Sequence, residues 1–196
     1  MNCLINWEAY AMPDIFLFAI LLIVLVIGLS LLAFQVMTDV PPMSASSAEA
    51  ADIIALLKQA NLSEQAIVYE LGCGWGMLVV ALARAFPDAQ IRGIEMSPFP
   101  YWIGRLRTRN MPNVFLQRGN FYNYDLRDAD AVTCYLMIKK MSKLANFLDE
   151  MLKPGTPVVS LTFWFRDREV VAVKNGPGLR GEAALYYWPA HKIDTP

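Results

Sequence analysis

The chain has 196 residues, of which 56% are hydrophobic, with 17 basic side chains, 18 acidic ones and a single histidine. This length allows one domain with a sizeable core and one further element. The near-neutral charge gives no electrostatic footprint for nucleic acid, so no nucleic-acid partner is expected. One histidine and three widely spaced cysteines predict neither a metal site nor a disulfide framework.

The hydrophobic excess lies near the N-terminus. Residues 15–38 are 24 consecutive uncharged positions between Asp14 and Asp39. As a helix they would span about 36 Å, enough to cross the apolar core of a bilayer. The alternative is a cleaved signal peptide, but residues 1–14 contain no Lys or Arg, and the apolar run is longer than a signal-peptide core.

All 17 basic residues follow the apolar run, beginning at Lys58. The positive-inside tendency therefore predicts a single-pass membrane protein whose folded domain is cytoplasmic. The expected parts are a short extracytoplasmic N-terminus, a transmembrane helix, a linker and a folded domain, at residues 1–14, 15–38, 39–45 and 46–196.

Beyond residue 46, helix-like and strand-like runs alternate. Ser46 with Glu49 three residues later forms a capping box, which predicts a helix start. Alternation of this kind predicts an α/β domain with a mostly parallel sheet, and the last two strand-like runs predict an antiparallel hairpin. The later predicted elements are strands at 114–118, 131–136, 157–163, 169–173 and 184–188 and a helix at 142–152.

A glycine-rich turn follows the first predicted strand. Gly72, Gly74 and Gly76 precede a helical stretch, and a strand, a tight turn and a helix N-terminus together suit a nucleotide-like ligand. The spacing G-x-G-x-G differs from the G-x-G-x-x-G of dinucleotide sites. Glu70 at the strand end would repel a pyrophosphate but suits an ammonium, and Glu95 at the end of the next strand suits two ribose hydroxyls.

This pattern resembles the S-adenosylmethionine site of the class I methyltransferases; the alternative is a glycine turn in another α/β domain. The resemblance implies a Rossmann-like fold and S-adenosyl-L-methionine as cofactor, with Glu70 at the methionine ammonium, the three glycines against the cofactor and Glu95 at the ribose. It also implies Asn120 beside the adenine, where the class often has Asp. Met96 or Phe121 would sandwich the adenine ring, or both would belong to the core.

Within this class the chain resembles the small membrane-anchored protein-lysine methyltransferases that act on the ATP synthase c subunit and the adenine nucleotide translocase, and their bacterial relatives. The resemblance rests on Glu70-Leu71-Gly72-Cys73-Gly74-Trp75-Gly76, on Glu95-Met96-Ser97-Pro98 followed by Tyr101 and Trp102, and on an aromatic C-terminal hairpin. The chain departs from this group at residues 39–43, where an aromatic-Val-Pro-Thr-Pro entry is usual.

The residues for the methyl acceptor are less clearly marked. Tyr135 and Leu136 end the fourth predicted strand, next to where the methyl group should emerge. The aromatic side chains that either wall an apolar channel for a lysine or simply pack in the core are Trp75, Trp102, Trp164 and Phe165. No catalytic base is predicted. The cluster Lys139, Lys140 and Lys143 is either a solvated face or a contact with lipid headgroups or an acidic partner.

The sequence therefore predicts an S-adenosylmethionine-dependent methyltransferase at the membrane, with a protein lysine as the favoured acceptor. Its expected partners are the lipid bilayer and a membrane-protein substrate. One alternative is methylation of a lipid, a quinone or another small molecule. The other is a non-catalytic membrane-tethered adaptor, which the presence of Glu70, the three glycines and Glu95 disfavours.

Overall fold

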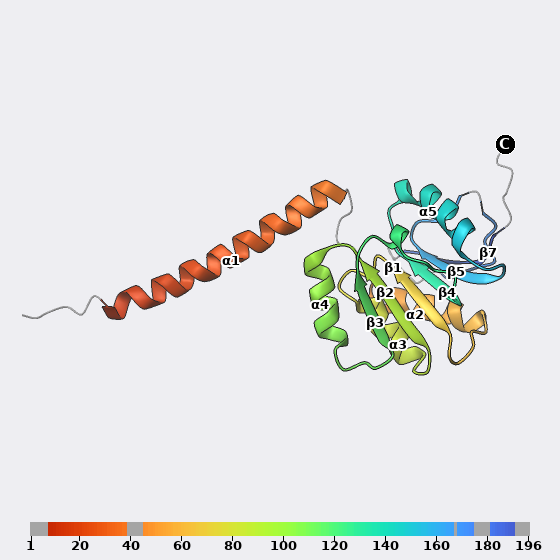
Figure 1. The fold of residues 1–196 in the computed structure, drawn as a ribbon, viewed down its shortest axis with the longest axis horizontal. Helices are drawn as coiled ribbons and strands as arrows, with labels where there is room; N and C mark the ends of the chain where they lie inside the picture. Colours follow the sequence, from red (N-terminus) through yellow and green to blue (C-terminus); the bar gives the residue numbers. More distant parts are fainter. Residues whose placement is uncertain (1–7, 39–44, 167, 175–180, 191–196) are drawn as a thin grey trace, which may run out of the picture. The chain divides into compact units, whose positions relative to one another are not determined.

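The computed structural model describes residues 8–38, 45–166, 168–174 and 181–190. The chain divides into two compact units, Met1–Pro41 and Pro42–Pro196. The first unit contains helix α1 (Glu8–Thr38), and the second contains the remaining helices and the sheet (Figure 1).

Helix α1 has 31 residues and begins before residue 15, inside the stretch predicted as a short N-terminus. Its side chains are described for residues 14–29, where those from residue 15 onward are apolar and, apart from Ile27, exposed. Among the residues whose side chains the structure describes, no helix is both long and apolar enough to cross a membrane. The membrane-spanning helix predicted at 15–38 is therefore not confirmed and stays a prediction.

The described residues of the second unit form a seven-stranded sheet in the order β3-β2-β1-β4-β5-β7-β6. The five strands β1 to β5 are parallel, whereas β7 pairs antiparallel with both β5 and β6. This arrangement confirms the mostly parallel sheet with antiparallel C-terminal strands. The strands are β1 Ile67–Leu71, β2 Gln90–Glu95, β3 Val114–Arg118, β4 Ala131–Cys134, β5 Thr156–Leu161, β6 Ala172–Lys174 and β7 Ala183–Trp188.

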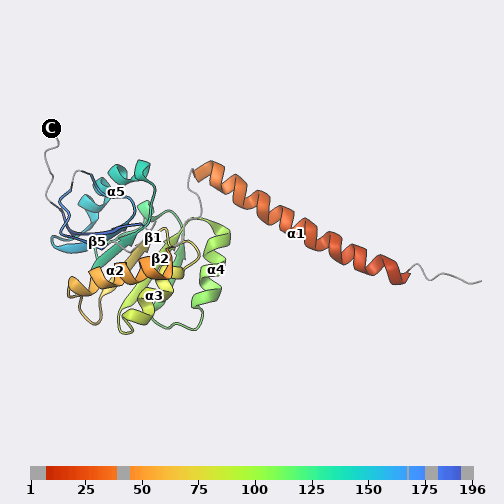
Figure 2. The ribbon, with the colours of Figure 1, turned by 180° about the vertical axis from the view of Figure 1, so that it is seen from behind.

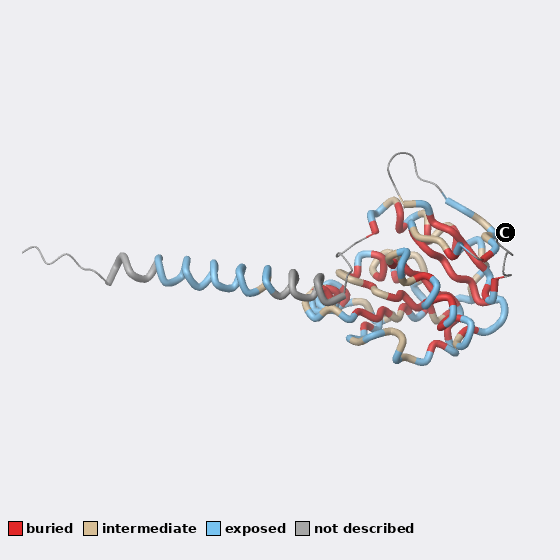
Figure 3. Tube along the Cα trace, turned by 90° about the horizontal axis from the view of Figure 1, so that it is seen from above, coloured by how far each residue is buried: buried red, intermediate tan, exposed pale blue. Residues whose placement is uncertain are grey.

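Helices cover both faces of this sheet (Figures 1 and 2). On one face lie α2 (Ser47–Gln59), α3 (Met77–Ala85) and α4 (Pro98–Thr108), and on the other lies α5 (Ile138–Met151). Two buried apolar clusters result, one on each face, and the central strands between them, β1, β4, β5 and β7, are mostly buried (Figure 3). The single-turn helix η1 (Phe121–Asn123) follows β3.

The capping box predicted at the start of α2 is present. The Ser46 backbone N–H donates to Glu49 Oε2 at 2.7 Å, and the Glu49 N–H donates to Ser46 Oγ at 3.3 Å. The Glu49 carboxylate also accepts the N–H of Gly181 at 3.0 Å, so the same side chain ties the start of α2 to the segment before β7.

Several predicted boundaries differ from the structure. Helix α5 begins at Ile138 rather than residue 142, because its buried face already includes Met141. Strand β4 ends at Cys134, two residues before Leu136. Strand β5 ends at Leu161 because the next residue, Thr162, has φ +67°, which no strand residue adopts. The predicted strand at 169–173 is reduced to β6, which starts at Ala172.

Candidate functional site

The glycine-rich turn joins β1 to α3 at the carboxyl end of the parallel strands. Gly72, Gly74 and Gly76 all have positive φ, at 76°, 52° and 75°. Residues that carry a Cβ rarely adopt this backbone conformation, whereas glycine adopts it readily. Gly76 is also the N-cap of α3, and no side chain caps the helix there. The N-cap residue therefore offers no side-chain acceptor to the start of α3, which lies at the place predicted for the cofactor.

Glu95, at the end of β2, holds this turn. Its Oε2 accepts the N–H of Gly74 at 2.8 Å, and its Oε1 accepts the N–H of Ser97 at 2.6 Å. The side chain is only 8% exposed. A carboxylate offers about four lone-pair sites, so each oxygen retains acceptor capacity for a ribose hydroxyl while it holds the backbone.

Glu70, at the end of β1, is buried, and its Oε2 has no hydrogen-bond partner. Burial raises the pKa of the Glu70 carboxyl well above its usual range; the nearby Glu95 carboxylate raises it further, and the backbone N–H of Val79 lowers it. A buried, unpartnered carboxyl oxygen is costly. The methionine ammonium of S-adenosylmethionine would satisfy it, so the residues present fit that cofactor.

Close packing between α4 and the turn maintains this geometry. A Cβ on Gly76 would lie 3.2 Å from the Cα of Gly104 in α4, and a Cβ on Gly104 would lie 3.5 Å from the carbonyl oxygen of Gly74. Arg107 of the same helix donates to the carbonyl oxygen of Trp75 at 2.7 Å. Neither Gly104 nor Arg107 was predicted from the sequence. The sequence did contain a signal for Gly104, because a glycine four residues after Pro100 lies on the same face of the helix and allows close packing there.

The residues predicted around the adenine lie in different surroundings. Met96 directly follows Glu95 and is 42% exposed, which leaves its side chain accessible to a ligand. Asn120 is exposed and caps η1, its Oδ1 accepting the N–H of Tyr122 at 3.2 Å. Phe121 packs against Tyr122 and Phe147, with ring centroids 4.4 Å and 6.4 Å away. The structure therefore places Phe121 beside the core and Met96 at the surface.

The acceptor candidates do not form one group. Leu136 is buried against the glycine turn, with its Cδ2 3.0 Å from where a Cβ on Gly72 would lie. Tyr135 packs against the core cluster on the α2 and α3 face of the sheet. Trp75 contacts Phe99 of α4 edge-on at 5.6 Å between ring centroids. Of the two further aromatic candidates, Phe165 is a core residue and Trp102 is exposed on α4.

Trp164 does line a hollow, of about 320 Å³, at the carboxyl end of β5. The described residues around it are Ile138, Thr162, Phe163, Trp164, Arg166 and Glu182. Thr162 forms the turn that shapes the wall, because the Phe163 N–H donates to the Leu161 carbonyl across it at 2.8 Å. A non-glycine residue with φ +67° marks a tight γ-turn, a strained conformation common at functional sites.

Comparison with known proteins decides the family. The model of the ANTKMT methyltransferase domain matches residues 70–172, which begin at Glu70 and cover more than half of the chain. The chain belongs to the ANTKMT methyltransferase domain family. A protein-lysine N-methyltransferase of Saccharolobus islandicus is 30% identical over 143 residues, or 70% of this chain and 88% of that protein.

Solved structures agree with this assignment. An RNA methyltransferase of Salinibacter ruber, in complex with S-adenosyl-L-homocysteine, is 26% identical with a TM-score of 0.68, over 78% of this chain and 98% of that one. A Geobacter sulfurreducens S-adenosylmethionine-dependent methyltransferase shares the fold at 20% identity and a TM-score of 0.52, over 65% of this chain and 53% of that one. This ANTKMT-domain chain is therefore a Rossmann-like class I enzyme that uses S-adenosylmethionine.

Metal-binding side chains do not gather in the part of the enzyme that the structure describes, which contains no group of three or more His, Cys, Asp or Glu residues placed to hold an ion. Cys73 and Cys134 are free thiols in the two apolar clusters. Burial raises the pKa of both thiols, that of Cys134 to about 12, so neither is a reactive thiolate near neutral pH.

Replacing Glu95 tests its assignment to the ribose. In the Glu95→Ala enzyme we expect the affinity for S-adenosylhomocysteine to fall tenfold or more, because each lost charge-assisted hydrogen bond contributes about 1.5–3 kcal/mol. Isothermal titration of the full-length protein measures this. Glu64→Ala, which removes an exposed carboxylate elsewhere, is the matched control, and equal affinities in the two variants would contradict the assignment.

Replacing Glu70 tests its assignment to the ammonium. Because its pKa is raised by folding, the native state binds more protons than the unfolded state, and the free energy of unfolding falls as pH rises above the usual Glu range. Glu70→Gln should remove this dependence and stabilise the free enzyme at neutral pH, yet weaken S-adenosylhomocysteine binding about tenfold. Urea unfolding across pH, with titration at neutral pH, measures both effects. Stability curves of the same slope for both proteins would contradict the raised pKa, and an unchanged affinity for S-adenosylhomocysteine would refute the assignment to the ammonium.

Proposed function

We propose that this enzyme is a membrane-attached protein-lysine N-methyltransferase. The observation that carries the proposal is the relative from Saccharolobus islandicus, which is named a protein-lysine N-methyltransferase and is matched over 88% of its length. The hollow beside Trp164 supports it, because it lies at the carboxyl end of β5, on the same edge of the sheet as the glycine turn that follows β1. Open α/β sheets bind their ligands at that edge.

The composition of the hollow suits the side chain of lysine. Phe163, Trp164 and Ile138 provide apolar walls for the four methylene groups. Glu182 and Arg166 at the same hollow carry opposite charges. The net charge of the hollow therefore does not select the substrate, and we expect its apolar walls to do so. Desolvation between these walls lowers the pKa of the entering amine and favours its neutral, nucleophilic form.

S-adenosylmethionine, when bound, supplies an electrophilic methyl group for transfer to the amine nitrogen. The enzyme's own residues hold the two reactants. The glycine turn, Glu70 and Glu95 fix the cofactor end, and the turn at Thr162 fixes the wall of the acceptor end. Alignment of the reacting atoms to about 3–3.5 Å is the main contribution expected from such a site.

Truncating Trp164 tests the acceptor hollow. We expect the Trp164→Ala enzyme to lose about tenfold or more in kcat/KM for the protein acceptor, because a wall of the lysine channel is missing, while its affinity for S-adenosylhomocysteine stays within about twofold. Phe115→Ala, an exposed aromatic residue on β3, is the control. A kcat/KM for Trp164→Ala equal to that of the control would remove Trp164 from the acceptor site.

The identity of the acceptor class is tested by labelling. Membranes that contain the enzyme, incubated with methyl-labelled S-adenosylmethionine, should accumulate label in protein, and acid hydrolysis should release it as methyl-lysine. Label in a lipid extract would support the small-molecule alternative. Label in RNA would support an activity like that named for the Salinibacter ruber structure.

The membrane attachment we propose is supported by the sequence of α1. Its residues 15–38 are uncharged, and all 17 basic residues of the chain come later. Eight residues separate Thr38 from the first residue of α2, Ser47, which at most span about 29 Å. A domain on so short a link has a high effective concentration for membrane neighbours, so we propose that the substrate lysine lies on a membrane protein close to the cytoplasmic surface.

Alkaline carbonate extraction tests this attachment. The full chain should remain in the membrane pellet, and its N-terminal peptide should still contain Met1, because a permanent anchor is neither stripped by carbonate nor cleaved. A mature N-terminus near Ser46 would instead establish the signal-peptide alternative. Recovery of the intact chain in the supernatant would contradict both.

A further inference from the structure

The outward face of α4 exposes two large apolar side chains. Trp102 is 60% exposed and Leu106 is 58% exposed. They are four residues apart, so they lie side by side on one face of the helix. We call these two residues, with the arginines that flank them, Arg105 and Arg109, the α4 face.

The orientation of α4 leaves no way to bury this face. The buried residues of the helix are Pro100, Gly104 and Thr108, again four apart and on the opposite side. Gly104 packs backbone to backbone against the glycine turn, and Thr108 Oγ1 donates to the Gly104 carbonyl at 2.9 Å. Rotating the helix to cover Trp102 would break the contact that shapes the cofactor site, so the exposure of Trp102 and Leu106 is a property of the fold.

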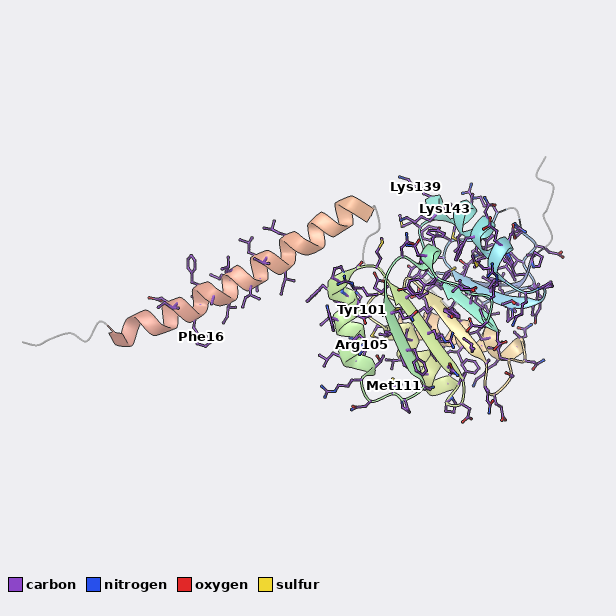
Figure 4. All side chains as sticks on the ribbon, viewed as in Figure 1. Phe16, Tyr101, Arg105, Met111, Lys139 and Lys143 are labelled. Atoms are coloured by element: carbon purple, nitrogen blue, oxygen red, sulfur yellow. The ribbon has the colours of Figure 1, made fainter. Side chains whose placement is uncertain are left out.

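The charge along this part of the chain has one sign. From residue 96 to residue 124 the chain has four arginines and no Asp or Glu, although the whole chain has a net charge of −1. Arg107 is held by the carbonyl oxygen of Trp75. Arg105 and Arg109 are exposed, and Figure 4 shows Arg105 on α4, one turn beyond Tyr101.

We propose that the α4 face docks on the surface of an anionic lipid bilayer. Tryptophan favours the interface between headgroups and acyl chains, leucine gains from burial among acyl chains, and arginines are attracted to anionic headgroups. A nucleic-acid surface would use the arginines and the ring of Trp102, but it gives no role to an exposed leucine at the centre of the patch. The bilayer therefore accounts for all four residues.

The inference rests on the proposed membrane attachment and adds to it. A helical anchor would keep the domain near the bilayer but would not by itself determine which face of the domain contacts it. Helix α4 starts three residues after Glu95, so docking of this helix would hold the cofactor edge of the sheet at the membrane surface. An acceptor lysine at that surface would then meet a domain whose orientation is already restricted.

The test uses Trp102 as its own reporter. Full-length protein is reconstituted in vesicles of phosphatidylcholine, with or without phosphatidylglycerol, whose acyl chains are brominated to quench tryptophan. The emission of Trp102 is obtained as the difference between the wild type and Trp102→Phe. We expect Trp102 to be quenched in the anionic vesicles, and more weakly in phosphatidylcholine alone.

Charge reversal supplies the matched comparison. The double variant Arg105→Glu, Arg109→Glu should lose the quenching of Trp102 in anionic vesicles yet still float with them and still bind S-adenosylhomocysteine. Arg84→Glu, which reverses an exposed arginine in the last turn of α3, should keep the wild-type quenching.

The outcomes that would contradict the inference can be told apart. Flotation of the wild type without quenching of Trp102 would reject docking by α4 while leaving the attachment intact, whereas failure to float would reject the attachment itself. Equal quenching in the double variant and the wild type would remove the arginines from the contact. Binding of a short single-stranded RNA that the double variant loses, with Trp102 unquenched by the vesicles, would assign the face to nucleic acid.

Discussion

The carboxylate of Glu95 is the interaction on which the rest of the site depends. Its two oxygens accept backbone N–H groups from Gly74 and from Ser97, so one side chain joins the loop after β1 to the loop after β2. Those loops lead directly into α3 and α4. The positions of both helices, and the width of the space between the two strand ends, are therefore fixed by a group that still has lone pairs for a ligand.

The neighbouring Glu70 carboxyl lies in an unfavourable environment. Its carboxyl is buried with one oxygen unpartnered, and the Glu95 carboxylate disfavours its charge. The free enzyme therefore holds a buried carboxyl oxygen without a partner, and the ammonium predicted to lie there would relieve this unfavourable interaction. If Glu70 binds the ammonium as predicted, cofactor binding and the stability of the domain are coupled through this one residue.

Glycines let the backbone close around the site. Gly76 and Gly104 bring α4 against the turn, and Gly93 in β2 leaves room for Leu116 and Cys73, whose side-chain atoms lie 2.5 Å and 2.9 Å from where its Cβ would be. The same contact that packs α4 against the glycine turn leaves Trp102 and Leu106 on the outer face of the helix. The packing of α4 against the glycine turn therefore also determines which of its side chains the domain exposes.

The sequence by itself determined the features that depend on local chemistry. The capping box at Ser46, the strand over residues 114–118 and the glycine turn between two acidic strand ends follow from residue type and spacing, and each lies where it was expected. The residues expected at the cofactor could be named from the sequence because they are close in the chain or at strand ends, and their contacts with the cofactor stay a prediction.

Only the tertiary structure revealed the hollow that we propose for the acceptor. The hollow brings together the start of α5, the turn after β5 and the residue before β7, so Ile138, Phe163 and Glu182 meet although they are far apart in sequence. Local pattern placed Tyr135 and Leu136 at a strand end, but β4 stops at Cys134 and those side chains pack in the two apolar clusters. Which face a side chain takes, and where a strand stops, is set by long-range pairing and packing, which residue spacing does not encode.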